Sequence, residues 1–251
     1  MGLAKRQNRR RGGAGRAPIG VGALALLGAA PIAAFAQSAT PTASSAPYGV
    51  LESAAGLVAC AETDLGSLPA DAKPTTRYDI VSEKSVARYR VMEELASIGI
   101  NEAVGETNAI IGQIGFDETG RPLACSRFDV DLRTLKSDEA RRDNFLYNNT
   151  LETETYPLAT FVLRAVERLD GPLTEGQETE FTLVGDLTAH GVTRLVAWNA
   201  AALREGDVLT GKAETTFQMP DFQIEPPRVP SVVSLEETVR LEIDITAQAT
   251  E

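Results

Sequence analysis

His190 is the only histidine in the 251-residue chain, so acid–base chemistry near neutral pH would depend on it. The conceivable nucleophiles are Cys60, Cys125, Ser126 and Ser137. Neither serine lies in a Gly-x-Ser-x-Gly turn of the kind that exposes a nucleophile. One histidine also excludes a metal site built from several histidines of one chain. We therefore predict no catalytic residue, cofactor or metal site, and interpret His190 as a structural corner residue or a ligand contact.

Arg141 and Arg142 are adjacent near the start of a segment that is expected to be helical. Two guanidinium groups in that position could bind a phosphate or another anionic head group. The competing interpretation is a surface ion-pair cluster with Asp138, Glu139 and Asp143. The sequence leaves both interpretations open.

Charge is unevenly divided along the chain. Residues 1–36 contain six of the 24 Lys and Arg residues and none of the 35 Asp and Glu residues, so residues 37–251 carry a formal charge of −17. Such an acidic body would repel phosphate backbones, which argues against a nucleic-acid partner.

The basic N-terminus resembles an export signal. An uncharged run from Ala17 to Ala36 ends in Ala34-Phe35-Ala36, the small-x-small pattern of a cleavage site. We therefore expect residues 1–36 to be a cleaved signal peptide of an exported protein, periplasmic or extracellular. The alternative is an uncleaved membrane anchor, because a run of ~20 residues can just span a bilayer.

Residues 37–76 are expected to form a flexible linker or pre-domain segment, because Ser, Ala, Thr and Pro dominate its first part. Cys60 lies in this segment, and Cys125 is the only other cysteine. Export would permit a disulfide between them, so a bond and two free thiols are both open.

From Arg77 onward, apolar and polar residues alternate with a period of two. The clearest run ends the chain, where Val239, Leu241, Ile243, Ile245 and Ala247 alternate with polar residues. Strands with one wet face are typical of antiparallel sheets. We count about eight or nine such strands, a number that suits a closed barrel over residues 77–248.

One segment departs from the alternation. Ser137-Asp138-Glu139 has the composition of an N-cap followed by an acidic first turn, which predicts a helix to about Leu151. Pro157 then blocks any continuation and begins the next strand. The fold class is therefore all-β, an antiparallel barrel with one helix between strands.

Residues 185–194 read Gly-Asp-Leu-Thr-Ala-His-Gly-Val-Thr-Arg, which resembles the signature of the YceI-like family. Gly191 suits the tight turn of a β-hairpin, which needs φ > 0. Further short motifs follow the family's order: Arg77-Tyr78-x-Ile80, Ser85-x-Ala87-x-Tyr89, Gly112-x-Ile114-x-Phe116-Asp117, Leu135-x-Ser137-Asp138 and Tyr156-Pro157-x-Ala159-x-Phe161. The resemblance covers roughly residues 75 to 248.

This resemblance implies a lipocalin-like barrel around an elongated apolar cavity that holds a polyisoprenoid or a related long-chain lipid. An isoprenoid quinone is a second ligand of this class. The inward-facing candidates for the cavity lining are Tyr89, Val91, Phe128, Val130, Phe161, Leu163, Leu183, Leu187, Trp198 and Phe217. The candidates for a head-group contact are Arg141, Arg142 and His190.

The expected function is non-enzymatic binding, sequestration or transport of such a lipid. Two alternatives remain: an enzyme acting on the lipid, and a structural or interaction barrel with a packed core. An eight-stranded barrel is just wide enough either to fill its interior or to hold one small ligand, so periodicity does not separate them. Membrane proximity and a homodimer are likewise left open.

Overall fold

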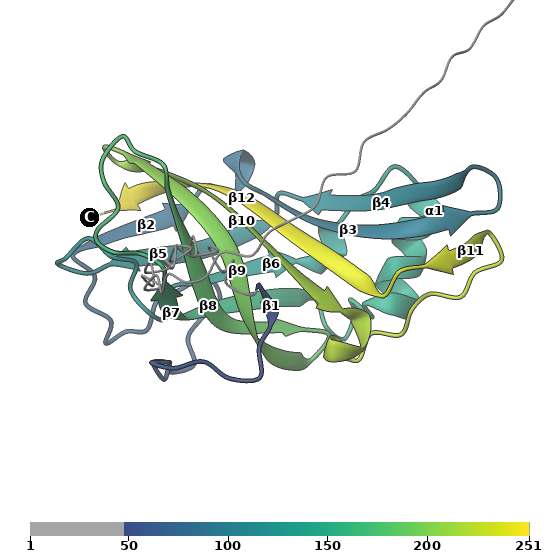
Figure 1. The fold of residues 1–251 in the computed structure, drawn as a ribbon, viewed down its shortest axis with the longest axis horizontal. Coiled ribbons are helices and arrows are strands. Elements are labelled where there is room, and N and C mark those ends of the chain that lie inside the picture. The colour runs from purple at the N-terminus through teal and green to yellow at the C-terminus, as the bar shows by residue number, and fades with distance from the viewer. Residues whose placement is uncertain (1–47, 251) are drawn as a thin grey trace, which may run out of the picture. The chain divides into compact units, whose positions relative to one another are not determined.

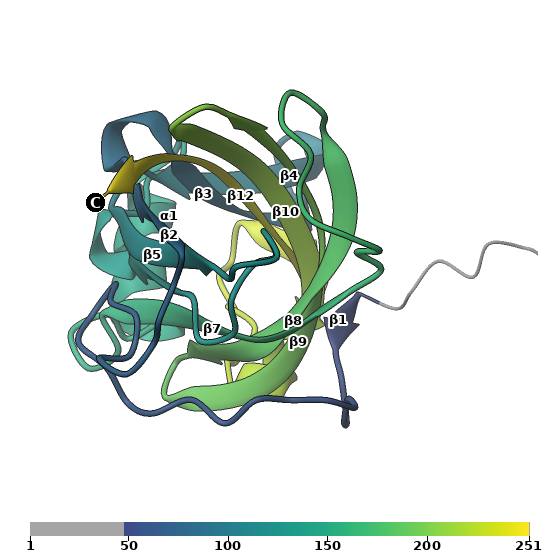
Figure 2. The same cartoon turned by 90° about the vertical axis from the view of Figure 1, so that its left-hand side faces the viewer.

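The computed structural model describes residues 48–250, and the expected signal segment 1–36 lies outside them. Eight antiparallel strands close into a barrel, in the order β9-β8-β7-β6-β5-β2-β12-β10 and back to β9 (Figures 1 and 2). They are β2 (Thr76–Ile80), β5 (Ile110–Phe116), β6 (Arg127–Asp131), β7 (Leu158–Glu167), β8 (Thr179–Ala189), β9 (Val192–Glu205), β10 (Val208–Gln218) and β12 (Thr238–Thr250). Closure pairs both edges of the sheet and confirms the all-β barrel.

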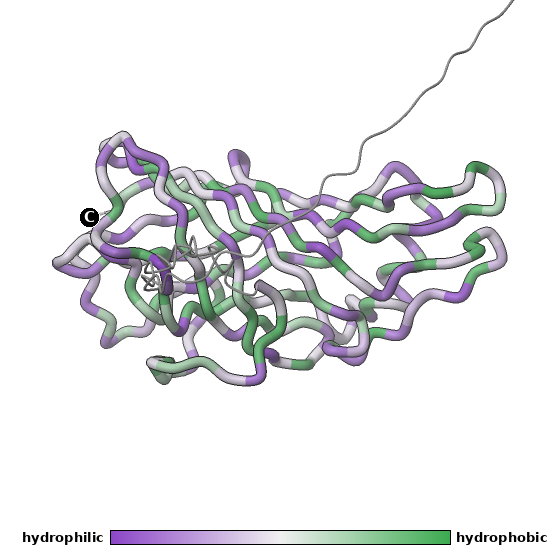
Figure 3. The backbone as a smooth tube through the Cα atoms, in the orientation of Figure 1, coloured by the Kyte–Doolittle hydropathy of each residue, from purple (hydrophilic) through white to green (hydrophobic). Residues whose placement is uncertain are grey.

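The alternation in the sequence places the core. In β12, Val239, Ile243 and Ala247 are buried, while Asp244 and Gln248, which directly follow Ile243 and Ala247, are exposed. The same exchange of apolar and polar residues is visible along most strands of the backbone tube (Figure 3). Inward apolar side chains therefore fill the barrel and outward polar side chains face water.

The wall extends past the closed ring on one side. Strands β2 and β3 (Val86–Leu95) pair with the same edge of β12, β2 with residues 247–250 and β3 with residues 240–244. The short 3₁₀ turn η1 (Ser82–Lys84) connects β2 to β3. Strands β4 (Gly99–Thr107) and β11 (Val232–Leu235) pair with β3. These three strands project from the barrel as a flared sheet (Figure 1).

The turn between β8 and β9 is the predicted hairpin corner. His190 and Gly191 occupy its two central positions with φ of 50° and 71°. Positive φ at both positions is the requirement of a type I′ turn, the two-residue turn that matches the strand twist. The glycine adopts this conformation without strain, and His190 is held in it by contacts described below.

A short helix lies between β6 and β7, as predicted. After the 3₁₀ turn η2 (Leu132–Thr134), α1 spans Ala140–Phe145 and continues as the π-helical turn η3 (Leu146–Thr150). Its N-cap is Glu139, whose carboxylate accepts from the Arg141 amide, two residues later than the predicted Ser137. The Ser137 hydroxyl instead hydrogen-bonds to the Asp143 carboxylate at 2.6 Å.

Strand β7 contains an irregularity that alternation does not reveal. The register with β8 shifts between Leu163 and Ala165, so that Val166 pairs with Leu183. After this bulge, the alternation of inward-facing and outward-facing side chains along the strand is shifted by one residue. Val166 packs against the core, whereas Ala165, inward by simple alternation, pairs with Val184 on the other face.

Residues 48–76 lie along the outside of the barrel, from β1 (Gly49–Val50) to β2 (Figure 2). Strand β1 pairs with Ala197 and Val196 of β9, next to where β9 and β10 separate. The sequence predicted a flexible linker for residues 37–76. In its described part, hydrogen bonds to groups such as the Asp129 carboxylate and one covalent bond join the segment to the barrel.

Candidate ligand-binding cavity

A cavity of about 90 Å³ lies inside the barrel. Strands β5 to β10 and β12 supply its lining, together with the connections before β6 and before β8. The lining residues are Ile114, Phe116, Pro122, Ser126, Arg127, Phe128, Phe161, Leu163, Leu173, Phe181, Leu183, Trp198, Ala200, Ala201, Ala202, Leu209, Gly211, Lys212, Ala213, Ile243 and Ile245. Nearly all of them are apolar.

The few polar lining residues direct their polar groups elsewhere. The Ser126 hydroxyl donates to the Leu123 carbonyl and accepts from the Gly115 amide. The Arg127 guanidinium pairs with Asp129 at 2.8 Å, and Lys212 pairs with Glu178 at 3.2 Å. A ligand in this cavity would therefore meet hydrocarbon on nearly every side, which favours apolar chains.

Three aromatic rings pack together beside the cavity. Phe128 and Phe161 stack with ring centres 5.2 Å apart, and Trp198 meets both edge to face, at 5.8 Å from Phe161 and 6.5 Å from Phe128. Gly185 makes room for them, since a Cβ there would lie 2.5 Å from the Phe161 ring. The glycine thus accommodates the protein's own side chain.

Beyond these rings the interior is filled. The main core cluster contains Val91, Val130, Leu187 and Phe217. It also contains Met219 and Phe222 of the 3₁₀ turn η4 (Met219–Phe222), and Ile224, which follows that turn. Half of the ten predicted lining residues, Phe128, Phe161, Leu163, Leu183 and Trp198, line the cavity. Val91, Val130, Leu187 and Phe217 lie in the packed core, and Tyr89 packs against it.

Apart from Trp198, the prediction missed the part of the lining that β9, β10 and β12 contribute. Ala200 and Ala213 are small inward-facing residues on neighbouring strands, and Ile243 pairs with Ala213. The available signal was a run of alanines in the longest strand. Small side chains at inward positions leave unfilled space, and this run marks where the interior is open.

Tyr89 brings a buried hydroxyl into the filled half of the barrel. This hydroxyl has no hydrogen-bond partner within residues 48–250. Burial raises the pKa of Tyr89 to about 12, against the opposing effect of the nearby Arg142. Gly105 on the adjacent strand leaves space for the ring, because a Cβ there would lie 2.2 Å from it.

The three head-group candidates do not line the cavity. Arg142 pairs with Glu93 of β3 at 2.9 Å and with Asp138 at 2.6 Å, whereas Arg141 is exposed. The Nδ1 atom of His190 lies 3.2 Å from the Phe222 carbonyl oxygen, and its ring packs edge to face on Tyr156 at 4.8 Å. Arg142 fastens the helix to the flared sheet, and His190 fastens its turn to η4.

Two further features of residues 48–250 bear on function. No three His, Cys, Asp or Glu side chains in this range are grouped as a metal ion would need. No helix in it has the length and apolar character required to cross a membrane.

The YceI-like domain model matches residues 78–247, about two thirds of the chain. The chain belongs to the YceI-like family. A UPF0312 protein of Shewanella baltica (strain OS155) is 28% identical over 153 residues, which are 58% of this chain and 76% of that protein. A UPF0312 protein of Pseudomonas putida (strain GB-1) is 34% identical over 137 residues, which are 51% of this chain and 65% of that protein.

Two solved structures share the fold of this YceI-like chain. A polyisoprenoid binding domain from Saccharophagus degradans has a TM-score of 0.55 at 15% identity and covers 71% of this chain with 100% of its own. BcnA of Burkholderia cenocepacia has a TM-score of 0.55 at 17% identity, covering 67% and 99% respectively. At these identities the likeness establishes the lipocalin-like barrel.

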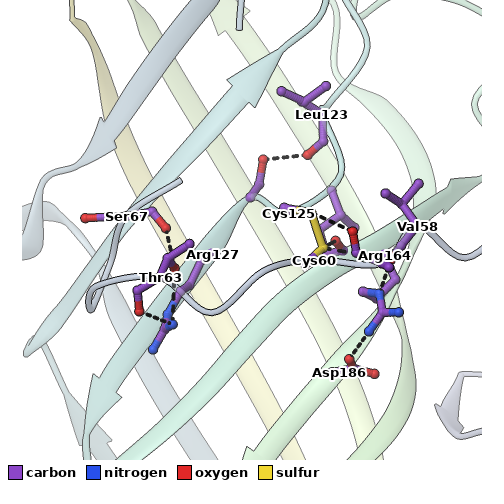
Figure 4. The surroundings of a disulfide bond; sticks show 12 residues. Val58, Cys60, Thr63, Ser67, Leu123, Cys125, Arg127, Arg164 and Asp186 are labelled. Atoms are coloured by element: carbon purple, nitrogen blue, oxygen red, sulfur yellow. Dashed lines mark hydrogen bonds and ion pairs between the residues drawn. A yellow bond between two sulfur atoms is a disulfide. The ribbon is translucent and has the colours of Figure 1, made fainter. Parts of the chain in front are cut away.

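A disulfide joins the YceI-like domain to the segment that precedes it. Cys60, in the segment outside the barrel, is bonded to Cys125, just before β6 (Figure 4). On one side of the bond, Arg164 of β7 contacts the Val58 carbonyl; on the other, Arg127 donates to the Thr63 carbonyl at 3.1 Å. The pairing that the sequence left open is thus present in the structure.

Proposed function

We propose that this chain is a non-enzymatic binding protein that sequesters or carries a long-chain apolar lipid, a polyisoprenoid or an isoprenoid quinone, in an exported compartment. The apolar lining of the cavity inside the closed barrel carries this proposal; because the cavity of about 90 Å³ is smaller than a long-chain lipid, core side chains around it must move aside when the ligand binds. Burial of a hydrocarbon chain contributes ~0.8 kcal/mol per CH₂, so such a ligand needs few polar contacts. The polyisoprenoid-binding domain among the structures of the same fold supports the ligand class.

One polar atom favours a ligand that contains oxygen. Trp198 lines the cavity, is 3% exposed, and its indole Nε1 has no hydrogen-bond partner in the described part of the chain. A buried donor without a partner costs about 1–3 kcal/mol. A quinone carbonyl or a prenol hydroxyl close to this nitrogen would accept its hydrogen, whereas a plain hydrocarbon would not.

Mass spectrometry of an organic extract tests the function. The full chain is purified from its native host, and its extract is compared with that of an unrelated protein purified in parallel. We expect an isoprenoid lipid enriched with this chain. Absence of any enriched lipid would contradict the proposal.

Replacement of Trp198 by Phe tests the oxygen contact. The variant keeps an aromatic ring but loses the N–H, so its affinity for decylubiquinone should fall by roughly 0.5–1.5 kcal/mol, the net value of one hydrogen bond. Squalene, an isoprenoid hydrocarbon, is the matched control and should bind equally well to both proteins. Equilibrium dialysis with mass-spectrometric quantification measures both. Equal loss for the two probes would contradict the contact.

The enzymatic alternative receives less support from the geometry. The Ser126 hydroxyl lines the cavity but is bound to backbone groups, and His190 lies outside the lining. A nucleophile and its base should approach within about 3 Å. Turnover of the extracted lipid by the wild type, lost in His190→Ala, would establish the alternative.

A further inference from the structure

The barrel wall is incomplete beside the cavity. Strand β6 has only five residues, which pair with Ile110–Gln113 of β5 and with Leu158–Val162 of β7. Both neighbours continue further, to Phe116 and to Glu167. Within residues 48–250, no strand lies between these continuations, so this part of the wall lacks the regular ladder that closes the rest of the barrel.

A loop, residues 117–126, fills the gap. Its Leu123 amide donates to the Gly115 carbonyl at 2.8 Å, and its Cys125 amide donates to the Leu163 carbonyl at 2.7 Å. The loop does not extend β6, because Pro122 lacks an N–H and Cys125 has a φ of 68°, outside the extended range. Pro122 and Ser126 face the cavity, so the loop is part of its wall.

The segment 51–75, which we name the strap, crosses the outside of this loop. Its Val58 amide donates to the Arg164 carbonyl of β7, its Gly66 amide to the Asp129 carboxylate of β6 at 2.6 Å, and its Leu68 amide to the Gln113 side chain of β5 at 3.0 Å. It thus spans all three strands around the gap. Figure 4 shows the strap passing over the loop at the Cys60–Cys125 bond.

Apolar burial holds the strap at its second half, where Leu68 is half-buried and Pro69 is buried, and contributes less near the disulfide. Two of its larger apolar side chains, Val58 and Leu65, are 47% and 51% exposed. Each hydrogen bond contributes only weakly to stability, so a segment that a few of them hold can open locally while the barrel stays folded. The disulfide is therefore the contact that keeps the strap on the loop when the hydrogen bonds open.

Along the barrel axis the cavity is bounded by packed side chains. The second core cluster, with Tyr78, Leu169, Leu173 and Leu209, lies towards the end where β9 turns into β10. The Phe128, Phe161 and Trp198 rings lie on the other side. The loop in the side wall is held instead by backbone hydrogen bonds, by the Ser126 hydroxyl, by the Arg121 guanidinium on the Leu169 carbonyl, and by the strap.

We propose that loop 117–126 is a lateral gate of the cavity, and that the Cys60–Cys125 disulfide holds it closed until a dithiol reductant opens it. The reductant transfers two electrons and two protons to the disulfide, which leaves two thiols, and is itself oxidised to a disulfide. The gate regulates the site of the proposed function, so its role in lipid passage rests on that function. Access to the cavity can be measured without any lipid.

Trp198 reports this access directly, because it is the only tryptophan of the chain and lines the cavity. Acrylamide quenching of its fluorescence is measured in the full chain, oxidised and after treatment with dithiothreitol. We expect the quenching constant to rise severalfold on reduction. The Cys60→Ser/Cys125→Ser double variant should show the higher value with or without dithiothreitol.

Hydrogen exchange distinguishes local opening of the gate from destabilisation of the whole barrel. Under the same conditions, exchange should rise far more in residues 51–68 and 117–126 than in β8 and β9, where exchange follows the global stability. An unchanged quenching constant on reduction, or an equal rise of exchange in all strands of the barrel, would overturn the proposal. The lipid extraction above fails or succeeds independently, since quenching reports access whatever the cavity binds.

Discussion

Phe161 and Leu183 lie on the neighbouring strands β7 and β8, and neither position should tolerate a charged side chain. Phe161 is 2% exposed, and both residues line the cavity. An aspartate at either position would lose its hydration or draw water into an apolar space, at a cost of several kcal/mol. We therefore expect Phe161→Asp to abolish lipid retention, measured by mass spectrometry of the organic extract.

The matched control is an outward position on the same barrel. Thr160 and Thr182 are on the outward-facing side of their strands by alternation, but neither is suitable. Thr160 donates a hydrogen bond to the Asp129 carboxylate, and Thr182 is buried. Thr210 of β10 is exposed, and Thr210→Asp should keep both the fold and the lipid. If circular dichroism shows Phe161→Asp unfolded and the wild type never yields lipid, the barrel is solid and structural.

Tyr89 should make stability depend on alkaline pH. Its pKa is raised to about 12 by burial, above the value of about 10 in an unfolded chain. Between these values the unfolded chain releases the proton and the native state keeps it. The contribution of the protonated Tyr89 hydroxyl to the free energy of unfolding is therefore complete below pH 10. It decreases by roughly 2–3 kcal/mol as the pH rises to about 12.

Urea unfolding of wild type and Tyr89→Phe checks this dependence. The free energy of unfolding should fall more steeply between about pH 10 and pH 12 in the wild type than in the variant, which lacks the titrating hydroxyl. The difference between the two proteins removes the effect of every other titrating group. Parallel pH profiles would contradict the burial of the hydroxyl.

At the level of elements, the helix α1 is held to the flared sheet by one ion pair. The Glu93 side chain is 5% exposed and receives hydrogen bonds from Arg142 and from Asn101, both at 2.9 Å. Glu93→Gln keeps the shape but removes the charge, so the free energy of unfolding should fall by about 2 kcal/mol. Urea unfolding measures the loss.

Asp138 provides the control for this ion pair. It contacts the same arginine, but its side chain is 86% exposed. Asp138→Asn should therefore cost at most about 1 kcal/mol, as solvent-exposed pairs do. Equal losses in the two variants would show that the buried pair does not fasten the helix.

For the whole molecule, the disulfide connects parts of the chain 65 residues apart. Closing a loop of this length lowers the entropy of the unfolded chain and stabilises the fold by about 4 kcal/mol in the chain-entropy description. Reduction, or the Cys60→Ser/Cys125→Ser double variant, should lower the urea midpoint of the barrel accordingly. A midpoint unchanged by dithiothreitol would mean that the bond does not constrain the unfolded chain.

Much of the fold could be predicted from local pattern alone. Alternation specified the faces of the strands, because successive side chains of a strand point to opposite sides. The pair His190-Gly191 specified a hairpin, because a two-residue turn requires positive φ. The ordered motifs indicated the YceI-like family and therefore the barrel, which the match over residues 78–247 establishes.

Tertiary structure alone decided the size of the cavity and the parts around it. The alternation of the strands predicts that Phe161 and Val130 both point inward. It does not predict that Phe161 lines a cavity while Val130 lies in a filled core. That difference depends on the volume the closed barrel encloses, less the volume of the side chains packed into it. The short β6, the bulge at Arg164 and the strap arise from contacts between distant residues, which no local period encodes.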